Sequence, residues 1–193
     1  MTRNTDDLFH GSSIETYSGI HVTPLDPKPE MIRLEDIAHA LSQQCRFAGH
    51  CKKFYSVAEH CVHVSHLVPM DFRRHALLHD AAEAYLMDIP RPLKKHLCFM
   101  IQDKPISYRF MEDRLMEIIA AHFGMQWNGM PPEVREVDNR MLVTEYLAFV
   151  NENQPPWASE MKPYVRSLGG LAPRDAKKAF LDRAHEVGVY EVK

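Results

Sequence analysis

A histidine, a histidine–aspartate pair and two further carboxylates lie close together in the middle of the sequence. His60 precedes the adjacent residues His79 and Asp80, and Glu83 and Asp88 follow them. Neutral imidazole and carboxylate groups together bind Mn, Fe, Co or Zn, and a site with open positions also admits water and substrate. A metal ion lowers the pKa of water, and a neighbouring carboxylate such as Glu83 can orient that water or take its proton. The pattern therefore predicts a metal site that can activate water.

A first helix is expected to carry His60. Ser56 and Glu59 have the spacing of a capping box, so this helix should begin at Val57. Its apolar face consists of residues at helical spacing, namely Val57, Cys61, Val64 and Val68. Pro69 should end the helix, because proline cannot continue a hydrogen-bonded helix interior.

A second helix is expected to carry the pair His79 and Asp80. Asp71 is a suitable N-cap for it. His79 and Glu83 would share one face a turn apart, and Asp80 would lie about 100° round the helix from His79. The run of residues 88–92 should stop the helix and form a rigid loop beside that face. The buried side would consist of Phe72, Ala76, Leu77, Ala81, Ala84 and Tyr85.

A fourth metal ligand has to come from another part of the chain, and Asp138 is the best candidate. It lies in the segment EVREVDNRMLVTEYLAF, which is expected to form a helix from Glu133 to about Phe149. The remaining elements are expected to be helices over residues 34–45, 106–123 and 173–187, a small hairpin over residues 16–22, and an irregular segment over residues 154–172.

These elements predict a single all-α domain with a small N-terminal β-hairpin. The length of 193 residues is sufficient for one domain with a sizeable core. Residues 1–12 are expected to form a loose leader. Residues 32–149 would form the metal-site core, and residues 150–193 a C-terminal loop and helix.

The candidate ligands resemble a known motif. The order His60, then His79–Asp80, then Asp138 is similar to that of the HD-domain metal phosphohydrolases. The stretches CRFAGHCKKFYSVAEH and HDAAEAYLMDIPRPLK resemble the YfdR-like branch, which is related to the YfbR-type 5′-deoxynucleotidases. The resemblance covers about residues 32–149. One position departs from it, because Arg91 stands where better studied relatives have a small hydroxyl residue.

The resemblance implies a fold, a cofactor and a set of catalytic residues. The fold would be an HD-domain helical bundle. One divalent metal ion (Co, Mn, Zn, Fe, Ni or Mg) would be bound by His60, His79, Asp80 and Asp138. Asp80 and Glu83 would also orient the attacking water.

Substrate contacts are expected from residues on either side of the motif. Arg46 offers two donors to a phosphate at once, so it is assigned to catalysis and to phosphate binding. Phe47 is expected either to stack on the sugar or base or simply to pack. Asp88 faces the substrate in the relatives, and it is assigned to the sugar. Arg91 and Lys94 would add positive charge at the mouth of the pocket.

The expected activity is removal of phosphate from nucleoside 5′-monophosphates, with deoxynucleotides favoured. Two alternatives stay open: release of triphosphate from deoxynucleoside triphosphates, and a non-catalytic sensor of metal or nucleotide. The GYP motif of HD proteins that hydrolyse cyclic dinucleotides is absent from the sequence. A second metal at His96 and His122 and a zinc–thiolate site at Cys45 and Cys51 are less favoured.

The overall composition narrows the class of protein further. With 45% hydrophobic and 25% charged residues, the chain has the composition of an ordinary globular protein. The net charge of −3 argues against a nucleic-acid or anionic membrane partner. No apolar run approaches the ~20 residues of a membrane span, and the N-terminus shows no secretory signal. The four cysteines lack CxxC spacing, which indicates reduced thiols and a cytoplasmic protein. The relatives indicate a homodimer.

Overall fold

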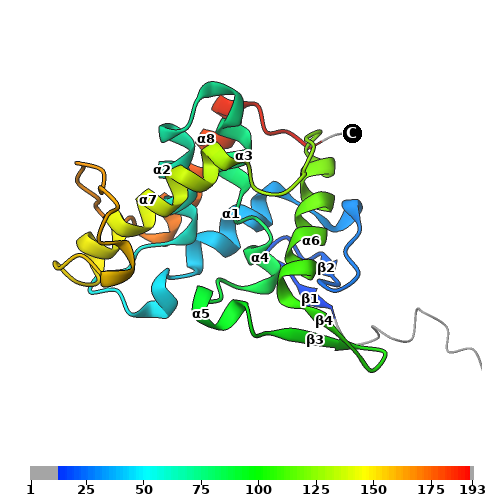
Figure 1. Cartoon of the computed structure of the whole chain (residues 1–193). Helices are drawn as coiled ribbons and strands as arrows, with labels where there is room; N and C mark the ends of the chain where they lie inside the picture. The colour runs from blue at the N-terminus through cyan, green and yellow to red at the C-terminus, as the bar shows by residue number, and fades with distance from the viewer. Residues whose placement is uncertain (1–12, 192–193) are drawn as a thin grey trace, which may run out of the picture.

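Helices form most of the chain, and two short hairpins complete it (Figure 1). The computed structural model describes residues 13–191, so the leader expected over residues 1–12 lies outside the described part. The helices are α1 (Leu34–Gln43), α2 (Val57–Leu67), α3 (Arg73–Leu78), α4 (Glu83–Leu86), α5 (Arg91–Lys94), α6 (Tyr108–His122), α7 (Pro132–Phe149) and α8 (Pro173–Val187). The strands are β1 (Ile14–Glu15), β2 (His21–Val22), β3 (Cys98–Ile101) and β4 (Lys104–Ser107). The mostly helical class and the N-terminal hairpin are thereby confirmed.

Two clusters of buried apolar side chains hold the helices together. The larger cluster joins α1, α2, α6 and α8, with Leu41, Leu115 and Phe180 among its fully buried members. The smaller cluster joins α2, α3 and α7 and includes Val64 and Met141. Because α2 belongs to both clusters, the helix that carries His60 is fixed on two sides. Among residues 13–191 the structure contains no helix with the length and apolar character needed to cross a bilayer.

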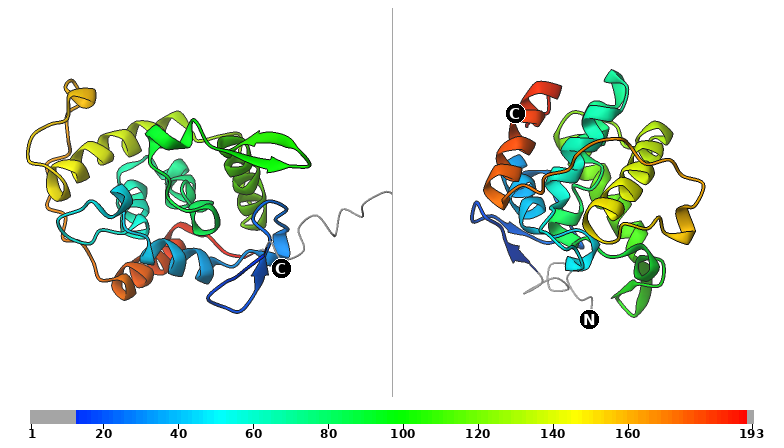
Figure 2. Two further views of the ribbon diagram at one scale, coloured as in Figure 1. Left: turned by 90° about the horizontal axis from the view of Figure 1, so that it is seen from below. Right: turned by 90° about the vertical axis from the view of Figure 1, so that its left-hand side faces the viewer.

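The second hairpin was not predicted from the sequence. Figure 2 shows β3 and β4 projecting from the helical body. Their antiparallel pairing closes at Ile101 and Lys104, and the two residues between them have positive φ values. This turn geometry favours asparagine and glycine, whereas the chain has glutamine and aspartate there, so the turn signal is absent. The helix expected from Ile106 therefore begins later, at Tyr108, with Ser107 as its N-cap.

The predicted second helix is interrupted where it carries the candidate ligands. α3 ends at Leu78 and α4 begins at Glu83, with tighter turns between them. The Glu83 N–H bonds to the Asp80 carbonyl at 3.0 Å, which is the three-residue spacing of a 3₁₀ turn. His79 Nδ1 bonds to the Ala76 carbonyl at 2.7 Å, and in an α-helix that carbonyl would be the acceptor for the Asp80 N–H. The expectation of one continuous helix was therefore wrong in this turn.

The predicted helix caps were partly right. Ser56 caps α2, since its hydroxyl accepts a hydrogen bond from the Glu59 N–H at 3.1 Å. The Glu59 carboxylate does not complete the box; its Oε2 instead accepts from the Leu171 N–H at 2.6 Å and anchors the irregular segment before α8. Asp71 is not a cap, because it lies inside a 3₁₀ turn, Met70–Phe72, that precedes α3.

The loop expected over residues 88–92 is present only up to residue 90, because the short helix α5 begins at Arg91. Met87 ends α4 with a φ of +71°, and Pro92 lies in the first turn of α5. Proline is tolerated in a first turn because its missing N–H would have no partner inside the helix. The outcome is that Arg91 and Lys94 lie at opposite ends of one helical turn.

The side chain of Gln44, at the end of α1, ties this segment to the core. Its Nε2 donates to the Glu83 carbonyl at 3.0 Å, and its Oε1 accepts from the Asp88 N–H at 2.9 Å. One amide therefore fixes the backbone at both ends of α4, beside two residues assigned to the site.

We expect Gln44→Ala to lower the free energy of unfolding by about 1–3 kcal/mol, because it leaves the Asp88 N–H without its partner and removes one of the two hydrogen bonds to the Glu83 carbonyl. Urea denaturation monitored by circular dichroism measures this. The matched control is Gln43→Ala, one residue earlier and exposed, which should change stability by less than about 0.5 kcal/mol. Equal effects of the two substitutions would contradict the role given to Gln44.

Candidate metal centre

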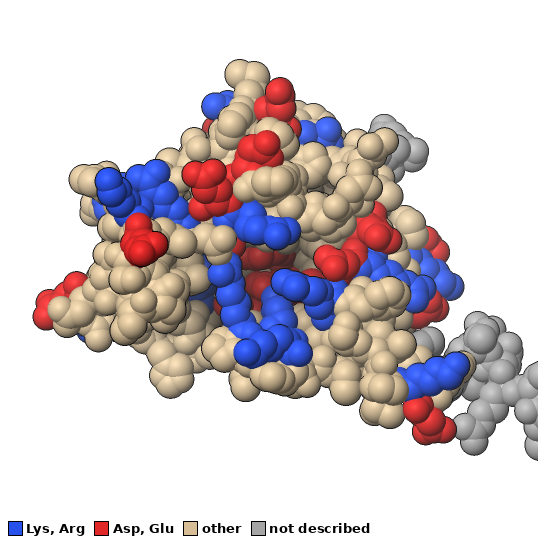
Figure 3. Space-filling view, viewed as in Figure 1, with Lys and Arg blue, Asp and Glu red and all other residues tan. Residues whose placement is uncertain are grey.

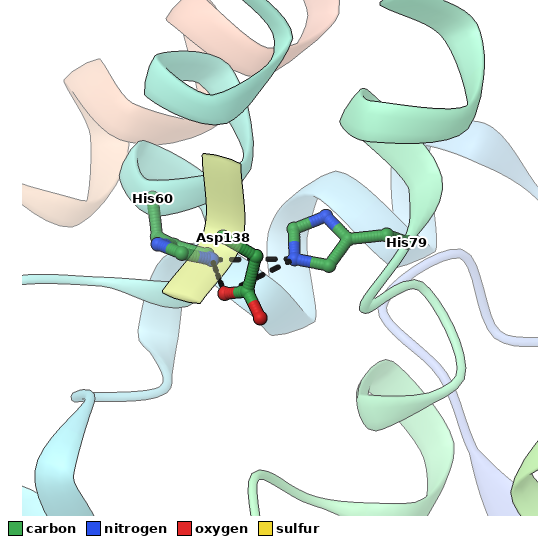
Figure 4. A group of neighbouring side chains, drawn as sticks. All are labelled: His60, His79 and Asp138. Carbon is green, nitrogen blue, oxygen red and sulfur yellow. Dashed lines mark hydrogen bonds and ion pairs between the residues drawn. The ribbon is translucent and has the colours of Figure 1, made fainter. Parts of the chain in front are cut away.

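Three side chains from three different elements point toward one another in the interior (Figure 4). His60 comes from α2, His79 from the turn after α3, and Asp138 from α7. The Nε2 atoms of the two imidazoles are 3.2 Å apart. Asp138 Oδ1 lies 3.2 Å from His60 Nε2 and 3.9 Å from His79 Nε2. All three side chains are buried.

Asp80 adds a second carboxylate at the same point. Its Oδ2 lies 3.2 Å from His79 Nε2 and 3.7 Å from His60 Nε2. Ligand atoms that each sit about 2.0–2.2 Å from one metal ion are separated by roughly 3.0–3.5 Å at tetrahedral or octahedral angles. The observed separations are close to that range, so the four side chains expected to bind a metal do converge, and a divalent cation could bind there with little movement.

Both imidazoles are oriented by a bond at the nitrogen that faces away from the cluster. His79 Nδ1 bonds to the Ala76 carbonyl at 2.7 Å, and His60 Nδ1 bonds to Glu145 Oε1 at 2.6 Å. A carbonyl and a carboxylate can only accept, so each Nδ1 carries a proton, and each ring in its neutral form would present the lone pair of Nε2 to the cluster. Bonds of this kind fix the tautomer of histidines that bind metals.

The carboxylates and imidazoles shift one another's pKa values. Burial raises the pKa of Asp138, but the hydrogen bond and the charge of His60 outweigh it and hold the pKa at about 2. Burial lowers the pKa of His79, but the charge of Asp80 outweighs it, so the pKa lies well above its ordinary value. A cation must therefore compete with protons for the imidazoles, and its affinity should fall as the pH is lowered.

Glu83 lies beside the cluster with one carboxylate oxygen held and the other free. Lys94 Nζ donates to Glu83 Oε1 at 3.1 Å and to Glu112 Oε1 at 2.6 Å. Glu83 Oε2 is buried and has no hydrogen-bond partner among residues 13–191. Burial, and then the charges of Asp80 and Asp88, raise the pKa of Glu83 well above its ordinary value. Such a carboxyl group is suited to proton transfer nearer neutral pH.

Arg46 is buried and turned toward the cluster. Its Nη1 lies 3.7 Å from Asp80 Oδ2, and its Nε lies 3.0 Å from Glu145 Oε2. Phe47 follows with a φ of +55°, which is uncommon for a residue other than glycine. Its ring packs edge-on against Tyr146, with centroids 6.3 Å apart. The packing role expected of Phe47 is therefore observed, and stacking on a base stays a prediction.

Arg91, expected at the mouth of the pocket, reaches one of the candidate ligands. Its Nη2 donates to Asp138 Oδ2 at 2.8 Å, and its Nη1 donates to Asn139 Oδ1 at 2.7 Å. The arginine side chain is 60% exposed, whereas Asp138 is buried. Arg91 thus links the surface directly to the candidate ligand.

The site opens on the face shown in Figure 3. Acidic side chains lie at the floor of a hollow, and lysine and arginine side chains gather around its edge. The short helix α5, which carries Arg91 and Lys94, lies at this edge. Asp88 is half-buried in the loop before α5; burial raises its pKa, although the charge of Arg46 opposes this. A basic edge above an acidic floor favours an anionic ligand that approaches a bound cation.

Two acidic residues of the site were missed in the sequence. Glu145 is fully buried and bonds to His60 and to the Tyr55 hydroxyl, the latter at 2.8 Å. It follows Asp138 by seven residues, two turns further along the same face of α7, and that spacing was a usable signal. Glu112 had no comparable signal, because its bond to Lys94 depends on how α6 packs beside α5.

The less favoured histidines and cysteines take no part in the cluster, and neither do His63 and His75, which lie near His60 and His79 in the sequence. His63 lies 3.6 Å from Glu59, and His75 bonds to the Gln126 carbonyl at 3.1 Å. The groups of potential metal ligands found among residues 13–191 are His60–His79–Asp138 and Cys61–His79–Asp80, which overlap. Neither group includes the residues proposed for a second metal or for a zinc–thiolate site, namely His96, His122, Cys45 and Cys51.

Comparison with known proteins finds relatives in two bacteria. The chain is 42% identical over 183 residues to the uncharacterized protein YfdR of Escherichia coli (strain K12), a match that covers 91% of this chain and 96% of that protein. It is 35% identical over 117 residues to an uncharacterized protein of Rhodobacter capsulatus, covering 56% of each. No family model matches the chain. The names of these relatives carry no activity to this chain.

We expect His60→Ala and Asp138→Ala to abolish binding of a divalent metal, because each removes a ligand from a cluster of four. Metal content after loading and dialysis, together with the rise in melting temperature on adding Mn²⁺ or Co²⁺, measures this. His63→Ala, one turn from His60 on α2, is the matched control and should bind metal like the wild type. Retention of metal by Asp138→Ala would remove α7 from the site.

Proposed function

The chain belongs to the family of Escherichia coli YfdR, and we propose that it is a metal-dependent phosphohydrolase that removes phosphate from nucleoside 5′-monophosphates, with deoxynucleotides favoured. The observation that carries the proposal is the convergence of two imidazole nitrogens and two carboxylates at one buried point beside Glu83. The resemblance of the same residues to the HD-domain phosphohydrolases supplies the reaction class.

Each residue has a role that follows from its contacts. His60, His79, Asp80 and Asp138 would hold the metal ion. A bound divalent cation neutralises phosphoryl charge and lowers the pKa of water. Glu83 has a free oxygen on a carboxylate whose other oxygen is fixed by Lys94, so it can orient a water for in-line attack and accept its proton.

The phosphate would enter between the acidic floor and the basic edge of the hollow. Arg46 places a guanidinium 3.7 Å from Asp80, so a phosphate at the cation would lie within reach of its donors. Burial lowers the pKa of Arg46, but Glu145 and the other nearby carboxylates outweigh it, and the group stays charged. Because the Arg46 guanidinium is already held in place inside the protein, binding a phosphate would cost little reorganisation.

The rival activities differ in the product that they release. A triphosphohydrolase would release triphosphate and a nucleoside from the same cluster, and a sensor would bind the nucleotide without turnover. We propose the monophosphatase first, on the resemblance to the 5′-deoxynucleotidases. Incubating the metal-loaded protein with nucleoside mono-, di- and triphosphates and identifying the phosphate product by chromatography decides among the three.

We expect Glu83→Gln to keep metal binding and to lower turnover by about 100-fold or more, because it removes the group that takes the proton from water. Steady-state release of phosphate and metal content of the same preparation measure the two effects. Glu112→Gln is the matched control, since it alters the other carboxylate held by Lys94, and it should keep most of the activity. Normal turnover in Glu83→Gln would exclude Glu83 from the mechanism.

Asp88→Asn should change the preference between 2′-deoxy and ribo substrates, because it replaces a charged acceptor of sugar hydroxyls by an amide of the same shape. Arg46→Lys should lower kcat/KM equally for both sugars, because lysine keeps the charge but loses the paired donors. Measuring kcat/KM for matched deoxy and ribo nucleotides separates the two effects. If Asp88→Asn affects both sugars equally while Arg46→Lys is fully active, both assignments are wrong.

A further inference from the structure

We infer that Glu145 is a positioning residue that sets the orientation of a metal ligand and of the phosphate-binding arginine at the same time. The inference has two arms. The metal arm, which concerns His60, rests on the metal centre alone, and the arginine arm, which concerns phosphate binding by Arg46, rests on the proposed function. Glu145 is fully buried near the end of α7, so its carboxylate contacts other protein groups rather than bulk water.

The two oxygens of this carboxylate face different parts of the site. Oε1 accepts from His60 Nδ1 at 2.6 Å and from the Tyr55 hydroxyl at 2.8 Å. Oε2 lies 3.0 Å from Arg46 Nε, and neither of these two atoms has a hydrogen-bond partner among residues 13–191. The contact on the arginine side is therefore an ion pair without the alignment of a hydrogen bond.

Burial of this carboxylate has to be offset by its neighbours. A lone ionised carboxylate in the interior is costly, and its pKa rises until it is neutral. Here His60 and Tyr55 donate to Oε1, and the guanidinium of Arg46 lies beside Oε2. These contacts with site residues on both sides offset the cost of burying the carboxylate.

Only a carboxylate can serve both sides. His60 Nδ1 and Arg46 Nε are both donor groups, so each of the two oxygens that face them has to be an acceptor. A glutamine presents one acceptor and one donor, so one side always loses its partner. If the amide nitrogen faces His60, the imidazole must carry its proton on Nε2, where the metal would bind. If it faces Arg46, two donors meet at the ion pair.

A purely structural role would make a different prediction. The bond from Tyr55 to Oε1 links α7 to the loop before α2, and its loss alone would lower stability without changing the tautomer of His60. Tyr55→Phe tests that bond separately. Thr144, the preceding residue, is also buried, but its hydroxyl bonds to the Arg140 carbonyl and the Tyr164 N–H, away from the site. Thr144→Ala therefore reports the loss of an ordinary buried bond in α7.

The experiment measures metal affinity and stability on the same four full-length proteins: wild type, Glu145→Gln, Tyr55→Phe and Thr144→Ala. Co²⁺ affinity is measured by competition with a chromophoric chelator, and the Co²⁺ absorption spectrum reports the ligand geometry. We expect Glu145→Gln to weaken Co²⁺ binding by about 10–100-fold and to alter the spectrum. We expect Tyr55→Phe and Thr144→Ala to lower the melting temperature of the metal-free protein while keeping Co²⁺ affinity within about threefold of the wild type. Wild-type Co²⁺ affinity in Glu145→Gln would overturn the metal arm.

The arginine arm is tested with inorganic phosphate at saturating Co²⁺. Glu145→Gln should raise the inhibition constant of phosphate, and Arg46→Lys should raise it by a similar factor, with no further rise in the double variant. Additive effects in the double variant would overturn the coupling between the two residues. If the wild type hydrolyses no nucleotide, phosphate binding is measured calorimetrically; the metal arm then stands or fails without the proposed function.

Discussion

Two carboxylates and two imidazoles share one buried point, and the rest of the structure depends on keeping them there. Charges taken out of water are expensive unless they are paired, and the carboxylates here lie in an interior that excludes most solvent. The candidate ligands come from α2, α7 and the turn after α3, so no single element can hold the site. The small apolar cluster between α2, α3 and α7 brings these three elements together, and Gln44 fixes the segment that follows.

Acidic side chains outnumber basic side chains around this point. The acidic side chains of the site and its surroundings are Asp80, Glu83, Asp88, Glu112, Asp138 and Glu145, and the basic ones are Arg46, Arg91 and Lys94. If all are ionised and the histidines are neutral, three negative charges remain uncompensated. A divalent cation would offset most of that excess. In the metal-free site, protons on His79 and Glu83, whose pKa values are raised, can offset part of the same excess, so a cation would replace protons there.

Sequence reasoning found the parts of the fold that depend on local chemistry. The long helices follow from apolar spacing, and Ser56 caps α2 as its position predicted. The β3–β4 hairpin was missed because its turn carries neither asparagine nor glycine. The break at His79 was missed for another reason. The imidazole of His79 donates to the Ala76 carbonyl and so replaces a backbone hydrogen bond of the helix. The spacing of apolar residues does not reveal such a bond.

The residues of the site also differ in whether the sequence could predict them. The side chains expected to bind a metal could be named because their types and order form a motif, and the structure brings them together. Their partners Glu145 and Glu112 could not be named with the same ease, because a glutamate on a helix is most often exposed, and only packing shows that these two are buried or paired. Arg91 was placed at the mouth of the pocket, but it lies at the start of α5, and its position was expected to belong to a loop, so its bond to Asp138 was not predicted.

The bond between Arg91 and Asp138 affects how Asp138 could bind a metal ion. An aspartate can bind a metal through one oxygen or through both, and the bidentate mode uses two positions of the coordination shell. Arg91 holds Oδ2 of Asp138 at 2.8 Å, while Oδ1 faces His60. With Oδ2 engaged by a guanidinium, Asp138 would offer a bound cation only Oδ1. The exposed arginine would thereby limit the number of oxygens that the protein offers to a cation, and water or substrate would then have to complete its coordination.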